Sequence, residues 1–331
     1  MQHLRPCTCL VTGGAGFIGS HLAEALLAAG HTVSVVDDLS TGREDNIAHL
    51  KENPRFAFHR ASIEDEKTIE VLASKAQLIF HLAAAVGVKL IVEHPVRTIE
   101  TNIMGSEYVL KAGLKYGCRT LIASSSEVYG KSANVPFAED DDVLLGPTSR
   151  SRWAYAASKM IDEFLALAYV REYKADIICV RLFNTVGPRQ TGEYGMVVPR
   201  LVRQALRGED LTVYGSGNQT RCFCDVRDVV RALIGLAGVA KLDARVFNIG
   251  STEEISILQL AKRILELTGS SSKIVQLPFQ QAYAPGFEDM QRRVPNISRI
   301  SELIKWEPQH HLDAILRSVI EYERTNLRPA K

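Results

Sequence analysis

Three glycines that follow a short apolar segment constrain the fold of this chain more than any other feature. Residues 7–11 have the composition of a buried strand, and Gly13, Gly16 and Gly19 come directly after it, where a helical pattern of apolar residues begins. Glycine at these positions permits a tight turn, lets the backbone approach a pyrophosphate, and lets the helix pack closely on the strand. The spacing predicts a strand, a turn and a helix of the dinucleotide-binding type, with the helix N-terminus facing the phosphates.

The next apolar segment ends in an acidic residue. Residues 31–36 are expected to form the second strand, and Asp37 follows about twenty residues after the glycines. A carboxylate at this position can accept hydrogen bonds from a ribose diol and would repel a 2′-phosphate, which favours NAD over NADP. The alternative is an acidic residue of an ordinary turn within residues 37–42.

Strand and helix patterns alternate through the first half of the chain. Further strands are expected near residues 55–58, 77–80, 120–123 and 176–181, with helices at 64–73 and about 96–116. This order predicts an α/β fold, with a doubly wound parallel sheet of the Rossmann type. Since 331 residues exceed what one compact core usually holds, a smaller mixed α/β lobe that binds substrate is expected at the C-terminal side.

The alternation breaks after residue 183, and we place the domain boundary there. The expected division is 1–183 for the NAD-binding domain, 184–224 and 250–331 for the smaller lobe, and 225–249 as a return to the sheet through a strand at 246–249.

Tyr155 and Lys159 stand four residues apart, and therefore on one face of a predicted helix that continues to about residue 173. A neighbouring ammonium favours the phenolate, so Lys159 is expected to lower the pKa of Tyr155 and let it take a proton from a substrate hydroxyl near neutral pH. An accidental pair on an amphipathic helix would have the same spacing. The face of this helix expected to be buried carries Ile161, Phe164, Leu165 and Ala168.

Polar side chains follow the strand at 120–123. Residues 124–127 are three serines and a glutamate, and they come where open α/β sheets bind ligands, beyond the carboxyl end of a strand. Their hydroxyls can hold a sugar hydroxyl, although serines are also common in turns. The loop at 131–151 is expected to cover the pocket.

The balance of charge excludes several classes of partner. Lys and Arg total 39 against 38 Asp and Glu, without a block of like charge, so neither nucleic acid nor a membrane surface is expected as a partner. No apolar segment is long enough to span a bilayer and no signal-peptide pattern is present, which favours the cytoplasm.

Six cysteines lie at positions 7, 9, 118, 179, 222 and 224, several within apolar segments, and are expected to be reduced and buried. The two Cys-x-Cys pairs could bind zinc. Neither has another Cys or His at the usual structural spacing, so no metal site is expected.

Together these residues resemble the extended short-chain dehydrogenase/reductases that modify nucleotide sugars. The resemblance covers nearly the whole chain and includes residues 12–19, Asp37, residues 80–84, Tyr155 with Lys159, Asn184, residues 211–215 and Arg221. It implies a tightly held NAD, a UDP-linked sugar between the sheet and the smaller lobe, and a homodimer built from the helices near 96–116 and 152–173.

Within that family the chain is most similar to UDP-glucuronate decarboxylases. This likeness rests on residues 124–130, 146–147, 152–155, 221–223 and 292–295. Two positions differ from the usual pattern: Ser62 replaces an aspartate beside the adenine, and Ser125 replaces a threonine. The serine at 125 is equally typical of 4-epimerases.

The resemblance also assigns the site residues. It gives catalytic roles to Tyr155, Lys159, Ser125, Glu127 and Arg293. It places the cofactor against Gly13, Gly16, Phe17, Ile18, Gly19, Asp37, Ser40, Thr41, Gly42, Ser62, Ile63, Leu82, Ala83, Ala84, Tyr155 and Lys159. It places the sugar nucleotide against Ser126, Asn184, Val213, Tyr214, Arg221 and Arg293.

The implied chemistry passes through a 4-keto sugar. Tyr155 would remove the C4 hydroxyl proton, with Ser125 orienting that hydroxyl. A carboxylate at C5 could then leave as carbon dioxide, or Glu127 could remove the C5 proton with loss of water, or the ketone could rotate to give a 4-epimer. Decarboxylation of UDP-glucuronate is the first expectation. A UDP-glucose or UDP-glucuronate 4-epimerase, a UDP-hexose dehydratase, and a non-catalytic NAD-sensing protein remain alternatives.

Overall fold

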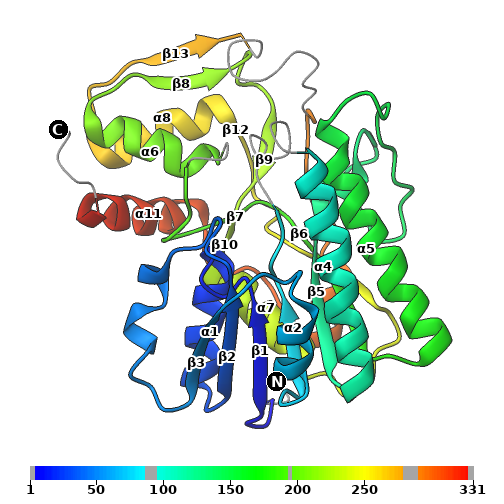
Figure 1. Cartoon of the computed structure of the whole chain (residues 1–331). Coiled ribbons are helices and arrows are strands. Elements are labelled where there is room, and N and C mark those ends of the chain that lie inside the picture. Colours follow the sequence, from blue (N-terminus) through cyan, green and yellow to red (C-terminus); the bar gives the residue numbers. More distant parts are fainter. Residues whose placement is uncertain (1–3, 86–94, 193–195, 279–289, 327–331) are drawn as a thin grey trace.

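A parallel sheet of seven strands forms the centre of the larger lobe (Figure 1). The computed structural model describes residues 4–85, 95–192, 196–278 and 290–326. The strand order is β11-β6-β5-β4-β1-β2-β3, with all neighbours parallel. Their bounds are β1 (Thr8–Thr12), β2 (Thr32–Asp37), β3 (Phe56–Arg60), β4 (Leu78–His81), β5 (Arg119–Ser125), β6 (Ile177–Leu182) and β11 (Val246–Ile249). The order reverses between β1 and β4, where such sheets bind ligands at the carboxyl ends of their strands.

Helices cover both faces of this sheet, as the expected doubly wound fold requires. Cys9 and Val11 of β1 pack in one core with α1 (Phe17–Ala28) and α7 (Val226–Ala237). Leu10 points to the opposite face, because side chains alternate along a strand. That face is covered by α2 (Glu66–Ala73), α4 (Pro95–Tyr116) and α5 (Arg152–Tyr173) (Figure 1).

The smaller lobe has a separate hydrophobic core. It contains α6 (Val197–Arg207), α8 (Ile257–Thr268), α11 (Leu312–Asn326) and the strand pairs β8 (Leu211–Tyr214) with β13 (Ile274–Leu277) and β9 (Thr220–Cys222) with β12 (Glu254–Ser256). Two further strands, β7 (Thr185–Val186) and β10 (Cys224–Asp225), pair where the chain passes between the lobes. The short helices are η1 (Glu44–Asn46), η2 (Ala48–Leu50), η3 (Ser126–Tyr129) and α10 (Ser298–Ile304).

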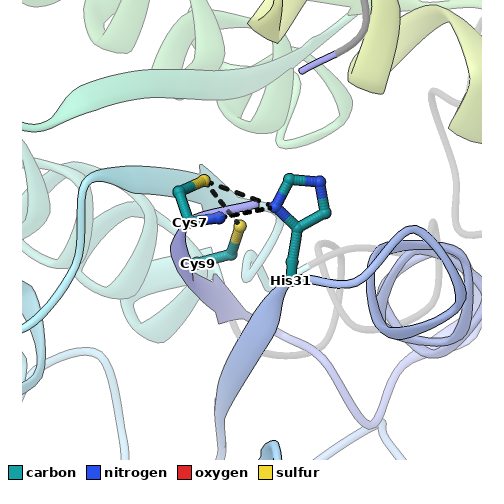
Figure 2. Close-up of side chains that lie close together, drawn as sticks. All are labelled: Cys7, Cys9 and His31. Carbon is teal, nitrogen blue, oxygen red and sulfur yellow. Dashed lines mark hydrogen bonds between the residues drawn. The ribbon is translucent and has the colours of Figure 1, made fainter. Parts of the chain in front are cut away.

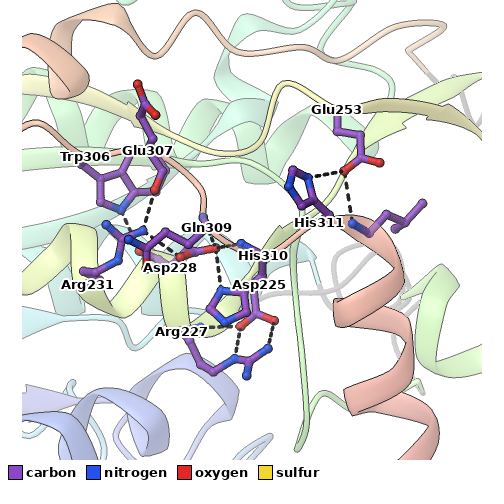
Figure 3. A network of polar contacts seen from close by, with 11 residues as sticks. Asp225, Arg227, Asp228, Arg231, Glu253, Trp306, Glu307, Gln309, His310 and His311 are labelled. Atoms are coloured by element: carbon purple, nitrogen blue, oxygen red, sulfur yellow. Dashed lines mark hydrogen bonds and ion pairs between the residues drawn. The ribbon is translucent and has the colours of Figure 1, made fainter.

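The segment near residue 300 packs on the larger lobe, although we expected all of 250–331 in the smaller one. Ile300 and Trp306 belong to the core shared with α1 and α7, and Trp306 Nε1 donates to the Asp228 carbonyl (3.0 Å). Asp228 Oδ2 also accepts from the backbone N–H groups of Gln309 and His310 (3.0 Å each), as Figure 3 shows. Although burial opposes it, hydrogen bonds from Arg231 and His310 lower the pKa of Asp228. This network fixes the chain that leads into α11.

The exposed face of α5 differs from the sequence prediction. Ile161 and Phe164 were expected to be buried but are 42% and 65% exposed, whereas Asp162 and Glu163 are buried. The reason is that each acid has a buried cationic partner, which apolar periodicity does not reveal. Within the described ranges, no helix combines the length and the apolar character that crossing a membrane needs.

Candidate active site

A cavity of about 470 Å³ lies between the carboxyl ends of the central strands and the smaller lobe. Its wall includes the glycine turn after β1, the ends of β4 and β5, the start of α5, and residues from α6 and β8. A cavity of this size and position between two lobes is typical of a small-molecule site.

The turn after β1 has the shape that the three glycines predict. Gly13 has φ +68°, and a Cβ there would lie 2.8 Å from the backbone of Ala83. A Cβ on Gly19 would lie 2.2 Å from the Gly13 carbonyl oxygen, so any side chain would push α1 away from the turn. Gly16 and Phe17 line the cavity at the N-terminus of α1. This is a close backbone approach at a helix N-terminus, which fits the pyrophosphate of a dinucleotide.

Asp37 is held at the edge of the cavity by backbone donors. Its Oδ2 accepts from the Ala15 N–H (3.0 Å) and its Oδ1 from the Leu39 N–H (2.8 Å). Burial raises the pKa of Asp37, and these two hydrogen bonds oppose the rise. The fixed carboxylate fits a ribose diol. Arg43 and Asn46 line the same region and were missed, because only the fold of η1 brings them there.

Most of the residues expected to hold the cofactor line the cavity. These are Gly13, Gly16, Phe17, Ile18, Gly19, Asp37, Thr41, Leu82, Ala83, Ala84, Tyr155 and Lys159. Four residues are placed elsewhere. Ser40 bonds to Asp38, Gly42 lies behind the Asp37 carboxylate, Ser62 bonds to Glu64, and Ile63 packs in the core under α4.

Tyr155 is buried at the floor of the cavity beside residues from β5 and from the segment near 293. Burial raises its pKa, the charge of Glu127 raises it further, and a hydrogen bond with Ser125 opposes the rise. The positive charge of Arg293 also acts to lower the pKa of Tyr155. The structure therefore brings together the four residues that were expected to meet at the sugar. The direction of this shift is opposite to the lowered pKa that was expected for Tyr155.

Lys159 is paired with an acid from its own helix. Its Nζ donates to Asp162 Oδ2 (3.0 Å), and the two side chains are only 3% and 1% exposed. Ser106 of α4 lies near Asp162 and acts to lower the pKa of that carboxyl, which burial raises. The negative charge of Asp162 raises the pKa of Tyr155. Asp162 thus offsets the ammonium that was expected to favour the phenolate.

Replacing Asp162 with asparagine is expected to lower the pKa of Tyr155 by about one unit, the shift that removal of one nearby charge produces. The acid limb of the pH profile of kcat/KM should then move to lower pH, because the phenolate forms at lower pH. The exposed Asp140 on the 131–151 loop gives a control, Asp140→Asn, which should leave the profile unchanged. An acid limb that stays in place, or moves to higher pH, in Asp162→Asn contradicts this role.

Glu127 and Arg293 form an ion pair next to Tyr155. Arg293 Nη2 lies 2.6 Å from Glu127 Oε1, and the Arg293 side chain is 9% exposed. The Phe137 N–H donates to the Val294 carbonyl (2.9 Å) and holds this segment against the larger lobe. Arg293 Nε is buried and has no hydrogen-bond partner among the described residues. A buried N–H of a guanidinium without an acceptor is suited to an anionic ligand.

The far end of the cavity is cationic. Asn184, Tyr214, Arg221 and Ser126 line the cavity as expected, whereas Val213 is fully buried in the core of the smaller lobe. The alternation of β8 explains this difference, since neighbouring residues of a strand face opposite sides.

Two further arginines line the cavity and were not predicted. Arg189 follows β7, and Arg200 lies on α6, with its guanidinium 4.6 Å from the centre of the Tyr214 ring. No local pattern marks them. Together with Arg221 they make a wall suited to a diphosphate.

Comparisons with known proteins agree with this geometry. A family model described as the NAD dependent epimerase/dehydratase family matches residues 9–250. The UDP-N-acetyl-alpha-D-glucosaminuronate decarboxylase of Bacillus cytotoxicus is 43% identical over 317 residues, which are 96% of this chain and 97% of that protein. UDP-glucuronic acid decarboxylase 1 of Xenopus tropicalis is 37% identical over 318 residues, covering 96% of this chain and 72% of that protein.

A solved structure is also similar to this chain over the whole fold. The UDP-glucuronic acid 4-epimerase of Bacillus cereus, in complex with UDP-glucuronic acid and NAD, has a TM-score of 0.86 and 30% identity. The match covers 97% of this chain and 100% of that one.

Proposed function

Because this chain belongs to the NAD-dependent epimerase/dehydratase family, we propose that it decarboxylates a UDP-linked hexuronic acid such as UDP-glucuronate. The observation that carries the proposal is the Glu127–Arg293 ion pair beside Tyr155, with a buried and unpartnered Arg293 N–H. Epimerisation at C4 needs only the proton-transfer residues. Loss of a C5 carboxylate also needs a cation for that carboxylate and an acid that returns a proton to C5.

The residues of the glycine turn, with Asp37, Tyr155 and Lys159, would hold NAD. Bound NAD supplies the redox chemistry, a hydride taken from the sugar and later returned. Tyr155, as a phenolate beside Ser125, receives the proton of the C4 hydroxyl as the ketone forms. Arg293 binds the C5 carboxylate, the bond from C5 to the carboxylate carbon breaks, and carbon dioxide leaves. The electron pair spreads into the C4 ketone as an enolate until Glu127 passes a proton from water to C5. Tyr155 gives its proton back to the C4 oxygen as the ketone is reduced.

The second candidate substrate has an acetamido group at C2. It is UDP-N-acetylglucosaminuronate, the substrate in the name of the Bacillus cytotoxicus relative, which is 43% identical to this chain. Purified protein offered each hexuronate, UDP-glucose and UDP-N-acetylglucosamine separately distinguishes the possibilities by product mass. Loss of carbon dioxide from a hexuronate supports the proposal. A product of unchanged mass indicates a 4-epimerase, and loss of water indicates a dehydratase.

Replacing Glu127 with glutamine is expected to reduce decarboxylated product by about 10²–10⁴-fold, the usual contribution of a positioned acid–base group. Oxidation at C4 should persist, since Tyr155 and Ser125 remain, and NADH absorbance measures it independently of carbon dioxide release. The control Glu266→Gln changes an exposed acid of the smaller lobe and should behave as the wild type. Unchanged decarboxylation in Glu127→Gln would remove Glu127 from the mechanism.

We propose further that two copies of the chain associate through α4 and α5. These helices lie side by side (Figure 1), and they carry much of the exposed apolar surface: Val96, Ile99, Met104, Ile161 and Phe164. Large exposed apolar residues gathered on two adjacent helices are typical of a protein interface.

Phe164→Glu is expected to convert the dimer to a monomer, because a carboxylate would be buried without a partner at the interface. Sedimentation velocity measures the change. The control Val71→Glu alters another exposed apolar residue, on α2, and should leave the dimer intact. A monomeric wild-type protein, or a dimeric Phe164→Glu variant, contradicts this interface.

We also propose that the enzyme works in the cytoplasm. All six cysteines are free thiols, and five of them are buried. Burial raises the pKa of the Cys118 thiol and that of Cys222, to about 12 for the latter. Unreactive free thiols are suited to a reducing compartment.

A further inference from the structure

Cys7, Cys9 and His31 meet at the amino-terminal edge of the sheet, far along the strands from the cavity (Figure 2). Strands β1 and β2 are parallel with Thr8 opposite Thr32, so the residues just before them, Cys7 and His31, also lie side by side. Cys9 lies two residues further on and points to the same side as Cys7. The Sγ atoms of the two cysteines are 3.8 Å apart, and Cys7 Sγ lies 3.4 Å from His31 Nδ1.

We propose that these three side chains bind a thiophilic divalent metal ion, with zinc as the test case. Two sulfurs held about 2.3 Å from one zinc ion at a tetrahedral angle are about 3.8 Å apart, and a sulfur and an imidazole nitrogen are then about 3.6 Å apart. The two separations described above, 3.8 and 3.4 Å, are close to these values. All three ligand atoms lie within 4.8 Å of one another, and in the part of the chain that the structure describes this is the one such group.

The imidazole presents the nitrogen that a metal needs. The Cys7 N–H donates to His31 Nδ1 (3.1 Å), so the lone pair of Nδ1 points toward Cys7 and the ring proton is on Nε2. A metal ion would take the place of this donor. Because Nδ1 accepts this hydrogen bond, it carries a lone pair, which is what a metal-ligating imidazole nitrogen needs.

The charge of the complete site favours a divalent ion. Two thiolates cancel a charge of +2, so the buried complex is neutral, whereas a monovalent ion would leave a net negative charge in a low dielectric. Cys7 is only partly buried, which leaves a route for the ion, and Cys9 and His31 are fully buried. Three protein ligands leave the fourth tetrahedral position for water.

Such an ion would connect the starts of β1 and β2, whose other ends carry the glycine turn and Asp37. Because it binds the folded chain and the cavity lies at the opposite ends of these strands, it should raise stability by mass action without taking part in the sugar chemistry. The inference is independent of the proposed function.

The test uses the reduced, metal-free full-length protein. Competition with a chromophoric chelator should show one zinc ion per chain, and cobalt should give the thiolate charge-transfer band and strong visible absorption of a tetrahedral site. Zinc should also raise Tm. Cys7→Ser should weaken zinc binding by more than about 10–100-fold, which is the cost of losing an outer-shell partner of a metal site. The matched control Cys222→Ala/Cys224→Ala removes the other Cys-x-Cys pair and should bind zinc as the wild type does.

A second measurement needs no variant. Zinc should protect Cys7 of the wild-type protein from alkylation, as followed by mass spectrometry, whereas Cys118 should react equally with and without zinc. Equal alkylation of Cys7 in both conditions overturns the site. So does cobalt absorption without a thiolate band, or a Cys7→Ser variant that is folded by circular dichroism and binds zinc with wild-type affinity.

Discussion

Replacing Tyr155 with phenylalanine should reduce turnover of the UDP-hexuronate by about 10²–10⁴-fold, which is the usual contribution of a positioned acid–base group. The phenolate of Tyr155 is the group placed to take the C4 hydroxyl proton, and its buried side chain lies near Ser125, Glu127 and Arg293. Because phenylalanine keeps the ring and removes only the hydroxyl, the shape of the cavity should persist. Binding of NAD and of the sugar nucleotide, measured by calorimetry, should therefore be retained.

Tyr173→Phe is the matched control, since it makes the same change on an exposed position of the same helix. It should leave turnover unchanged. If Tyr155→Phe turned over near the wild-type rate, another group would have to take the proton, and the mechanism would be wrong. A variant that bound neither ligand would show instead that the hydroxyl supports the structure of the cavity.

Arg181→Met should destabilise the protein by about 3–5 kcal/mol, the cost of removing one partner of a buried ion pair. On β6, Arg181 Nη2 donates to Glu163 Oε2 of α5 (2.7 Å), and these side chains are 8% and 7% exposed. Ser124 Oγ donates to Glu163 Oε1 (2.5 Å), and the guanidinium lies over the Tyr129 ring. These contacts fasten the helix that carries Tyr155 to the end of the sheet. The loss should appear as a lower urea midpoint.

Arg245→Met is the comparison variant, because it removes one partner of an ion pair that is partly exposed and therefore screened by water. Arg245 and Asp176 are 27% and 39% exposed, and Asp176 keeps Arg119 as a second partner, so this change should cost about 0–1 kcal/mol. The double variant Arg181→Met/Glu163→Leu should recover part of the loss, because it leaves no unpaired buried charge. Equal midpoints for Arg181→Met and Arg245→Met would mean that the buried pair adds nothing.

Sequence reasoning succeeded where the signal is local. The strand at β1, the turn at Gly13 and the start of α1 follow one another along the chain, and each rests on the conformational needs of a few neighbouring residues. The same holds for Tyr155 and Lys159, which the helical repeat alone places on one face. The end of β5 then brings Ser125 and Glu127 to Tyr155, because the first turn of α5 packs against that end of the sheet.

The sequence prediction failed where partners come from distant elements. The buried face of α5 depends on Arg181 of β6, which pairs with Glu163. The meeting of Cys7 with His31 depends on the register of β1 against β2, which no spacing between cysteines reveals. The position of Val213 depends on which side of β8 faces the core of the smaller lobe.

The path of the chain between its two lobes restricts how the enzyme can exchange ligands. The chain passes between them near residues 184, 224 and 250, and again on each side of the segment near residue 300. The first two passages are joined by the β7–β10 pairing and by the Cys224 N–H bond to the Asn184 carbonyl (2.9 Å). The Phe183 N–H bond to Ile249 (2.9 Å) joins the third. A hinge at a single flexible linker would let the lobes swing apart, whereas several passages, three of them joined by hydrogen bonds, must bend together. Large-angle opening is therefore disfavoured, and sugar nucleotides should enter and leave through local movements of the cavity rim.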